Sequence, residues 1–148
     1  MRKNIIHAFI LLVVVSMLTT SALAADNVDV SGNSVSAIQA SRYINTCETL
    51  ITANSGGEIA INCAVTGAST MDTIGVETLN IQKYSSGTWI TVKSYNSLYE
   101  YDSMQASVSA TYTGAIGSQY RVVATFYVAN SNGSDSRIMT TSSITAKS

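Results

Sequence analysis

The residue types that most often do chemistry in proteins are scarce in this 148-residue sequence. It contains one histidine, His7, and two cysteines, Cys47 and Cys63. His7 lies in a segment that we expect to be removed, so the mature chain is expected to lack imidazole. A Ser-His-Asp or Cys-His site and a histidine-containing zinc site are then excluded, and two cysteines are too few for a zinc site made of cysteine alone. We therefore expect no cofactor.

The acidic residues leave two further chemistries to consider. Glu77, Glu100 and Asp102 are candidates for the pair of carboxylates that glycoside hydrolysis requires. Asp26 with Asp29, or Glu100 with Asp102, are candidates for calcium, but neither cluster has the ligand density of a calcium loop. We interpret these residues as solvated loop acids, and we expect no metal site and no enzyme.

Aromatic residues are the most suggestive group. Five of them fall within 18 residues, namely Tyr84, Trp89, Tyr95, Tyr99 and Tyr101. Tyrosine and tryptophan offer a flat apolar face and a polar tip, which suits contact surfaces. One interpretation is a ligand-binding platform for carbohydrate or for a protein surface. The alternative is a set of cross-strand pairs and core side chains within a sheet.

Residues 1–24 have the features of a secretory signal peptide. Arg2 and Lys3 precede an apolar run from Ile5 to Leu18, and Ala22-Leu23-Ala24 forms a small-x-small cleavage site. A membrane anchor is the alternative, but the run is shorter than the ~20 residues that a bilayer span needs. We expect a secreted protein cleaved near Ala24/Ala25, with no membrane association afterwards.

Cleavage would leave a weakly acidic chain rich in hydroxyl side chains. Lys plus Arg would fall from 8 to 6 while Asp plus Glu stays at 9, so the net charge would be -3. Such a chain has no basic patch, and we expect no nucleic-acid partner. Serine and threonine provide 35 of the remaining 124 residues, which is typical of the exposed faces of secreted β-sheets.

The pattern after residue 42 is strand, turn, strand. Residues 25–42 are predicted to form an N-terminal arm, with a weak helical pattern around 34–38, and residues 43–148 to form one domain. Seven strands are expected: Tyr43–Thr52, Glu58–Thr66, Val76–Tyr84, Thr88–Tyr95, Ser103–Thr113, Gln119–Ala129 and Asp135–Thr145. Alternation of apolar and polar residues predicts an all-β antiparallel fold. The expected architecture is an immunoglobulin-like or fibronectin-like β-sandwich, with a small barrel as the alternative.

The first hairpin predicts a disulfide bond. If the turn is Asn54-Ser55-Gly56-Gly57 and opposed residue numbers sum to 110, Cys47 lies opposite Cys63. Exported proteins meet an oxidising environment, which favours a Cys47–Cys63 bond. The alternative is two free buried thiols.

The sequence also bears on the registers of two later hairpins. Pairing Phe126 with Ile138 matches two apolar faces and leaves a three-residue loop that ends at Gly133, where a positive φ is required. For the hairpin around Ser85-Ser86-Gly87, one register places Tyr84 opposite Trp89. A three-residue loop would instead turn Trp89 toward the side that holds the apolar residues of the preceding strand, and both registers remain open.

The region from Gly75 to Thr145 resembles a known group of proteins. The glycine-rich turn before Tyr120-Arg121-Val122 resembles the tyrosine corner of immunoglobulin-like sandwiches. The segment Ile81–Trp89 resembles the hairpin of small secreted single-sandwich proteins of Gram-positive, clostridia-like bacteria, which are mostly of unknown function. The resemblance implies a structural role for Tyr120, with its ring in the core and its hydroxyl bonded to a turn. It implies no catalytic residues.

These observations favour a secreted, non-enzymatic binding or surface-interaction module. A self-assembling extracellular protein is the first alternative, because the absence of proline and the few charges leave strand edges poorly guarded. A small carboxylate-dependent glycoside hydrolase is the second alternative.

Overall fold

The structure is a computed structural model that describes residues 34–37 and 41–148. Strands make up 80% of it and the antiparallel all-β prediction is confirmed. The predicted signal segment 1–24 and the calcium candidates Asp26 and Asp29 lie outside the described residues.

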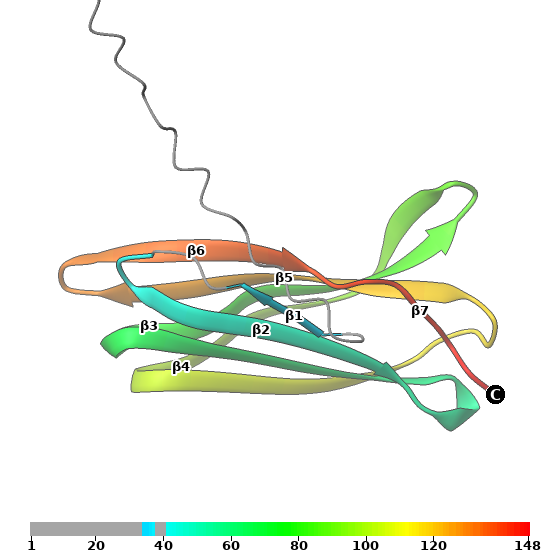
Figure 1. Ribbon diagram of the computed structural model, residues 1–148, viewed down its shortest axis with the longest axis horizontal. Coiled ribbons are helices and arrows are strands. Elements are labelled where there is room, and N and C mark those ends of the chain that lie inside the picture. The colour runs from blue at the N-terminus through cyan, green and yellow to red at the C-terminus, as the bar shows by residue number, and fades with distance from the viewer. Residues whose placement is uncertain (1–33, 38–40) are drawn as a thin grey trace, which may run out of the picture.

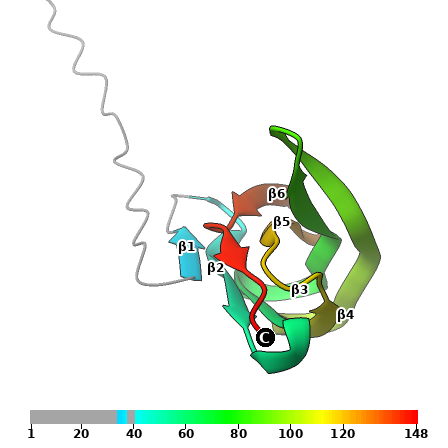
Figure 2. The same ribbon diagram turned by 90° about the vertical axis from the view of Figure 1, so that its right-hand side faces the viewer.

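Seven strands form one antiparallel sheet within the described part of the chain. They are β1 (Ser34–Ala37), β2 (Ile44–Ala53), β3 (Glu58–Ser85), β4 (Thr88–Thr113), β5 (Gln119–Asn130), β6 (Gly133–Thr140) and β7 (Ile144–Thr145). A short 3-10 helix, Ser55–Gly57, connects β2 to β3. The pairing order is β1-β2-β3-β5-β6, with β4 on β3 and β7 on β5, and the sheet curls like a half-barrel (Figure 2).

The long β3–β4 hairpin links two arms of this sheet. Residues 58–67 of β3 pair with β2 and with residues 105–113 of β4, which forms the arm that we call the β2 arm. Residues 71–85 of β3 pair with residues 88–103 of β4, and residues 73–83 also pair with β5, which carries β6. We call this part the β5 arm. In Figure 1 the two arms lie one above the other, and the tip of the hairpin rises from the body.

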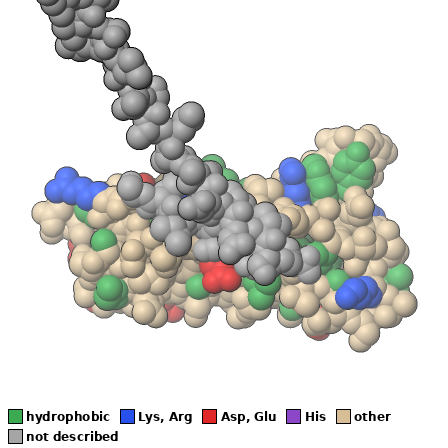
Figure 3. All heavy atoms as spheres, viewed as in Figure 1, with side chains coloured by type: hydrophobic (Ala, Val, Ile, Leu, Met, Phe, Trp, Pro, Cys, Tyr) green, Lys and Arg blue, Asp and Glu red, His purple; other side chains and the backbone are tan. Residues whose placement is uncertain are grey.

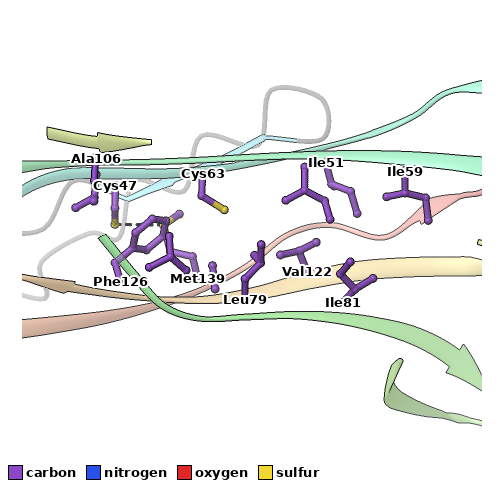
Figure 4. Packing of buried hydrophobic residues seen from close by; sticks show 14 of the residues in the cluster. Cys47, Ile51, Ile59, Cys63, Leu79, Ile81, Ala106, Val122, Phe126 and Met139 are labelled. Carbon is purple, nitrogen blue, oxygen red and sulfur yellow. Dashed lines mark hydrogen bonds between the residues drawn. The ribbon is translucent and has the colours of Figure 1, made fainter. Parts of the chain in front are cut away.

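The core lies between the two arms. Alternate residues of β2 and β3 point from the β2 arm toward alternate residues of β3 and β5 in the β5 arm (Figure 4). The Cys47 thiol donates to the sulfur of Met139 across this space, at 3.3 Å. The largest fully buried side chains include Phe126, Ile51, Ile61 and Leu79, and burying each such side chain contributes ~1.5–3 kcal/mol.

The strand boundaries differ from those predicted. The expected breaks around Gly67–Gly75 and between Tyr95 and Ser103 are absent, so four predicted strands form the two long strands β3 and β4. At the first of these two places, the β3–β4 ladder is irregular between Thr66 and Met71. Bulges of this kind let a strand bend without ending. The weak helical pattern at 34–38 was misleading, since Ser34–Ala37 is a strand that pairs with β2.

The predicted register of β2 against β3 is wrong by two residues. Cys47 lies opposite Val65, and Cys63 lies opposite Thr49. The turn is longer than expected, because Ala53 pairs with Ile59 around the 3-10 helix. A shift of two keeps every side chain on its face, so the apolar pattern cannot detect it. Both cysteines are buried, free thiols in this structure.

The predicted register of β5 against β6 is wrong by one residue. Phe126 lies opposite Arg137, not Ile138, and the loop contains two residues, 131–132. Met139 occupies the inward position opposite Ala124, which turns Ile138 outward with 69% of its surface exposed.

The β3–β4 hairpin adopts the first of the two registers considered. Tyr84 lies opposite Trp89, and the loop consists of Ser86 and Gly87. Both loop residues have left-handed backbone angles, with φ of 50° and 84°. Two consecutive positive φ values are typical of a type I′ turn, whose twist matches that of the flanking strands.

Tyr120 joins the turn before β5 to the core. Its ring is buried and packs against Tyr112, with ring centroids 5.7 Å apart. Its hydroxyl oxygen accepts a hydrogen bond of 2.8 Å from the backbone N–H of Ala115. A Cβ on Gly114 would lie 2.7 Å from the ring, so glycine is required there for the ring to fit under the turn.

Candidate functional site

One sheet face gathers most of the aromatic candidates. We call it the outer face, meaning the side of the β5 arm that points away from the core. Residues directly opposite in a ladder share a face, so the registers define its members. Residues on the outer face include Tyr84, Gln82, Asn80, Thr78 and Gly75 of β3, Trp89, Thr91, Ser94, Tyr99 and Tyr101 of β4, and Arg121, Thr125 and Tyr127 of β5.

The hairpin end of the outer face holds a packed aromatic and basic cluster. The rings of Tyr84 and Trp89 lie 5.1 Å apart at an angle of 53°. The Arg121 guanidinium carbon lies 4.4 Å from the Trp89 ring centroid, and its Nε donates to Oε1 of Gln82 at 2.8 Å. Tyr84 remains 44% exposed. The cluster therefore presents aromatic surface and a guanidinium held in one orientation. Figure 3 shows hydrophobic and basic side chains close together near the raised hairpin.

The other end of the outer face holds a tyrosine cluster. Tyr99 and Tyr127 lie on either side of Gly75, with ring centroids 6.0 Å apart. Tyr101 follows on β4 with 67% of its surface exposed. Partial burial raises the pKa of the Tyr99 hydroxyl, and the carboxylate of Glu77 raises it further. Tyr99 is thus a neutral hydroxyl donor over the whole physiological range.

Polar side chains fill the face between the two clusters. The Thr78 hydroxyl donates to Thr125 Oγ1 at 3.0 Å, and the Ser94 hydroxyl donates to Asn80 Oδ1 at 2.7 Å. The Asn80 amide N–H groups have no partner among the described residues. Tyr84 lies nine positions along β3 from Gly75, so the clusters are about 30 Å apart. The outer face is a long polar strip with aromatic rings at both ends.

Tyr95 is the one aromatic candidate that does not lie on this face. It pairs with the buried residue Leu79, packs partly against the core, and donates to the Thr111 carbonyl at 3.4 Å. Lys93, on the same side of β4, lies 5.1 Å from its ring. Tyr95 therefore has a structural environment, and the other four candidates remain.

Two irregularities in β4 explain why Tyr95 differs. Val92 is an extra residue between the pairs Ile81–Lys93 and Gln82–Thr91, which reverses the direction of the side chains that follow. Ser97, with a left-handed φ of 56°, reverses them again. In β4, odd-numbered side chains therefore point to the outer face before Val92 and after Ser97. Between these two residues, odd-numbered side chains point to the inner face.

Sequence reasoning missed three residues that complete the outer face. Arg121, Tyr127 and Gln82 reach it from β5 and β3. A search confined to one dense segment of aromatic residues cannot find them. The alternation along Gln119–Asn130, with Arg121 and Tyr127 on its polar side, was the available signal.

The carboxylate candidates lie on two neighbouring strands, β3 and β4. Glu77, Glu100 and Asp102 are all exposed, and residues 34–37 and 41–148 contain no group of three metal-binding side chains. A groove of about 420 Å³ runs along β4 between 97–100 and 106–109, and Glu100 is its single carboxylate. Glycoside hydrolysis needs two carboxylates that face one bond, so this groove does not favour the hydrolase alternative.

Within the described part of the chain, no helix is both long and apolar enough to cross a membrane. No known family model matches the chain, and no similar protein is found among curated sequences.

Proposed function

We propose that the protein is a secreted, non-enzymatic binding module whose outer face binds an extended carbohydrate chain. The observation that supports this function is the arrangement of two aromatic clusters at the ends of one sheet face, with amide and hydroxyl groups between them. The proposal includes export of the protein after cleavage near Ala24/Ala25. It also includes an immunoglobulin-like sandwich as the finer description of the fold.

The chemistry of this face suits a sugar chain better than a folded protein partner. Sugar rings have apolar faces that stack on tyrosine and tryptophan, and hydroxyl rims that bond to amides and hydroxyls. Most outer-face side chains of β3 and β5 are half-buried in their own hydrogen bonds and ring contacts. Such preorganised groups lose little entropy when a ligand binds. A long strip also matches a linear ligand.

The chain offers a direct assay, since Trp89 is its single tryptophan. Titration with soluble polysaccharides, followed by tryptophan emission and calorimetry, is expected to detect binding to at least one linear glycan. Trp89→Ala and Tyr101→Ala should each weaken that binding about tenfold or more, by removing a stacking platform at either end. Tyr95→Phe, on the opposite face, is the matched control and should bind normally.

A panel of neutral and acidic linear glycans that gives no signal with the wild-type protein would refute the carbohydrate function. Equal binding by Tyr101→Ala and wild type would limit the site to the hairpin end and refute the extended face.

A second candidate function is self-assembly through the edge of β4. This strand has 26 residues and, among the described strands, pairs on one side alone, with β3. It contains no proline, and Met104 is 47% exposed along it. Unguarded edges of this kind can pair with another copy. Sedimentation velocity should then show oligomers whose fraction rises with concentration, and Met104→Lys should reduce them. A monomer at all concentrations would exclude this function.

A further inference from the structure

The hairpin end of the outer face carries a cation, Arg121, although the chain as a whole is acidic. The segment from Thr78 to Tyr99 contains no acidic residue, and its two lysines, Lys83 and Lys93, share the opposite face with their ladder partners Tyr120 and Ile81. Arg121 joins it from β5, in a stretch from Gly114 to Ser134 that also lacks acids. The acids closest in sequence, Glu77 and Glu100, lie toward the tyrosine cluster. One end of the face therefore favours an anionic group through its charge.

Arg121 is held in a way that leaves its terminal nitrogens free to bind. Its Nε donates a hydrogen bond of 2.8 Å to Gln82 Oε1, and its guanidinium carbon lies 4.4 Å from the centroid of the Trp89 ring. Gln82 is itself placed by Thr91, 3.5 Å away. The two Nη groups have no partner within residues 34–37 and 41–148. A guanidinium fixed at one edge and open at its end is suited to bind a carboxylate through two parallel hydrogen bonds.

We propose that this end of the outer face is a subsite for a sugar residue that bears a carboxylate, as in a polyuronate chain. The carboxylate binds the Arg121 Nη groups, and the ring of the same or the next sugar stacks on Tyr84 beside Trp89. This inference rests on the proposed carbohydrate function and adds the substrate class. A sulfate ester can also accept two parallel hydrogen bonds from a guanidinium, but its oxygens are weaker acceptors than those of a carboxylate, so a carboxylate is favoured.

The test compares two forms of one polymer. Polygalacturonate and its methyl-esterified form have the same sugar chain, but the ester removes the charge. The wild-type protein is expected to bind the acidic form at least tenfold more tightly, with an affinity that falls as salt is added. Dextran sulfate serves as the sulfated probe and is expected to bind more weakly than polygalacturonate.

Variants distinguish a specific contact between Arg121 and the carboxylate from general electrostatic attraction by nearby cations. Arg121→Gln should lose most of the preference for the acidic form, so that the two polymer forms bind with similar affinity. Arg121→Lys should restore part of the preference, because it returns the charge without the bidentate geometry. Lys93→Gln, which removes a cation from the opposite face of the same hairpin, should keep the preference. Circular dichroism of each variant verifies that it is folded.

The outcomes distinguish this inference from the function on which it rests. If neither polymer form nor any neutral glycan binds, the proposed function is wrong. If both forms bind equally, or if Arg121→Gln leaves the preference intact, the carbohydrate function stands and the carboxylate subsite is refuted. Tighter binding of dextran sulfate than of polygalacturonate would also refute it, since the site would then respond to charge density alone.

Discussion

The guanidinium of Arg121 on β5 lies 4.4 Å from the centre of the Trp89 ring on β4, although β3 runs between the two strands. The contact crosses β3 through Gln82, which accepts a hydrogen bond from Arg121 Nε. Three strands therefore fix the hairpin end of the outer face. A side chain held from two directions keeps its orientation before any ligand arrives, which lowers the entropic cost of binding.

Removing this guanidinium should expose Trp89 without unfolding the protein. Arg121→Gln is expected to shift tryptophan emission to longer wavelength and to increase quenching by acrylamide. The free energy of unfolding should fall by ~0.5–1 kcal/mol, the usual contribution of an exposed cation–π contact. Lys93→Gln provides the control, because Lys93 lies on the other face of β4 and should leave the emission unchanged. An unaltered spectrum for Arg121→Gln would mean that Arg121 does not cover the ring in solution.

The turn before β5 should be intolerant of a single methyl group. In Gly114→Ala the new Cβ would lie 2.7 Å and 2.8 Å from two ring carbons of the buried Tyr120. The ring cannot move aside in a packed core, and overpacking of this kind costs about 1–3 kcal/mol. The displaced hydroxyl would also lose the N–H of Ala115. Urea denaturation of the variant measures the loss.

Gly117→Ala is the matched control for that experiment. It lies in the same turn and has no atom within 4 Å of its added Cβ, but its φ is +78°. It should lose only the ~1–2 kcal/mol of a residue forced into the left-handed region. Because Gly114 does not have a positive φ, a Gly114→Ala variant as stable as the wild type would contradict the tight fit of the Tyr120 ring under the turn.

The sequence predicted the strands better than their registers, for a physical reason. The two-residue loop at Ser86-Gly87 is specified locally, because its backbone angles suit few residues. The β2–β3 register depends on a turn that contains a 3-10 helix, and a two-residue error leaves both faces unchanged. The β5–β6 register was predicted wrongly because Ile138, a strongly apolar residue, was assumed to face the core, whereas it is exposed.

The candidate site was predictable in part. Trp89, Tyr84, Tyr99 and Tyr101 share the face that simple alternation assigns to them. Tyr95 does not, because the irregularities at Val92 and Ser97 are set by pairing with β3 and have no local signature such as glycine. The residues that β5 contributes depend on a contact between distant parts of the chain, which no single segment reveals.

The free thiols lead to a prediction about redox state. Cys47 and Cys63 are buried on adjacent strands but are not opposite each other. Purified protein, unfolded in guanidinium without reductant, should therefore take up two iodoacetamide groups, as measured by intact mass. The folded protein should react slowly, because burial raises the pKa of both thiols and shields them from the reagent. An unfolded, unreduced chain that takes up no label would show that a Cys47–Cys63 disulfide forms and that the β2 register changes.

The Cys63 thiol should also make stability depend on alkaline pH. Burial raises its pKa from 9.0 to about 11 in the folded state. Between these values the unfolded chain has released the proton while the folded chain retains it, so stability falls as pH rises. Below pH 9 the contribution is fully present. At ~1.4 kcal/mol per pH unit, the loss reaches about 2 kcal/mol at pH 11, where the folded thiol is itself half deprotonated.

Cys63→Ala isolates this effect from other alkaline titrations. The variant is expected to be less stable at pH 7, by about 1 kcal/mol for the lost packing, but to lose less stability between pH 9 and pH 11. Cys47 and Tyr99, whose pKa values are also raised, are present in both proteins, so their contributions cancel in the difference. Urea denaturation at several pH values measures both curves. Parallel curves over this range would contradict a protonated, buried thiol at position 63.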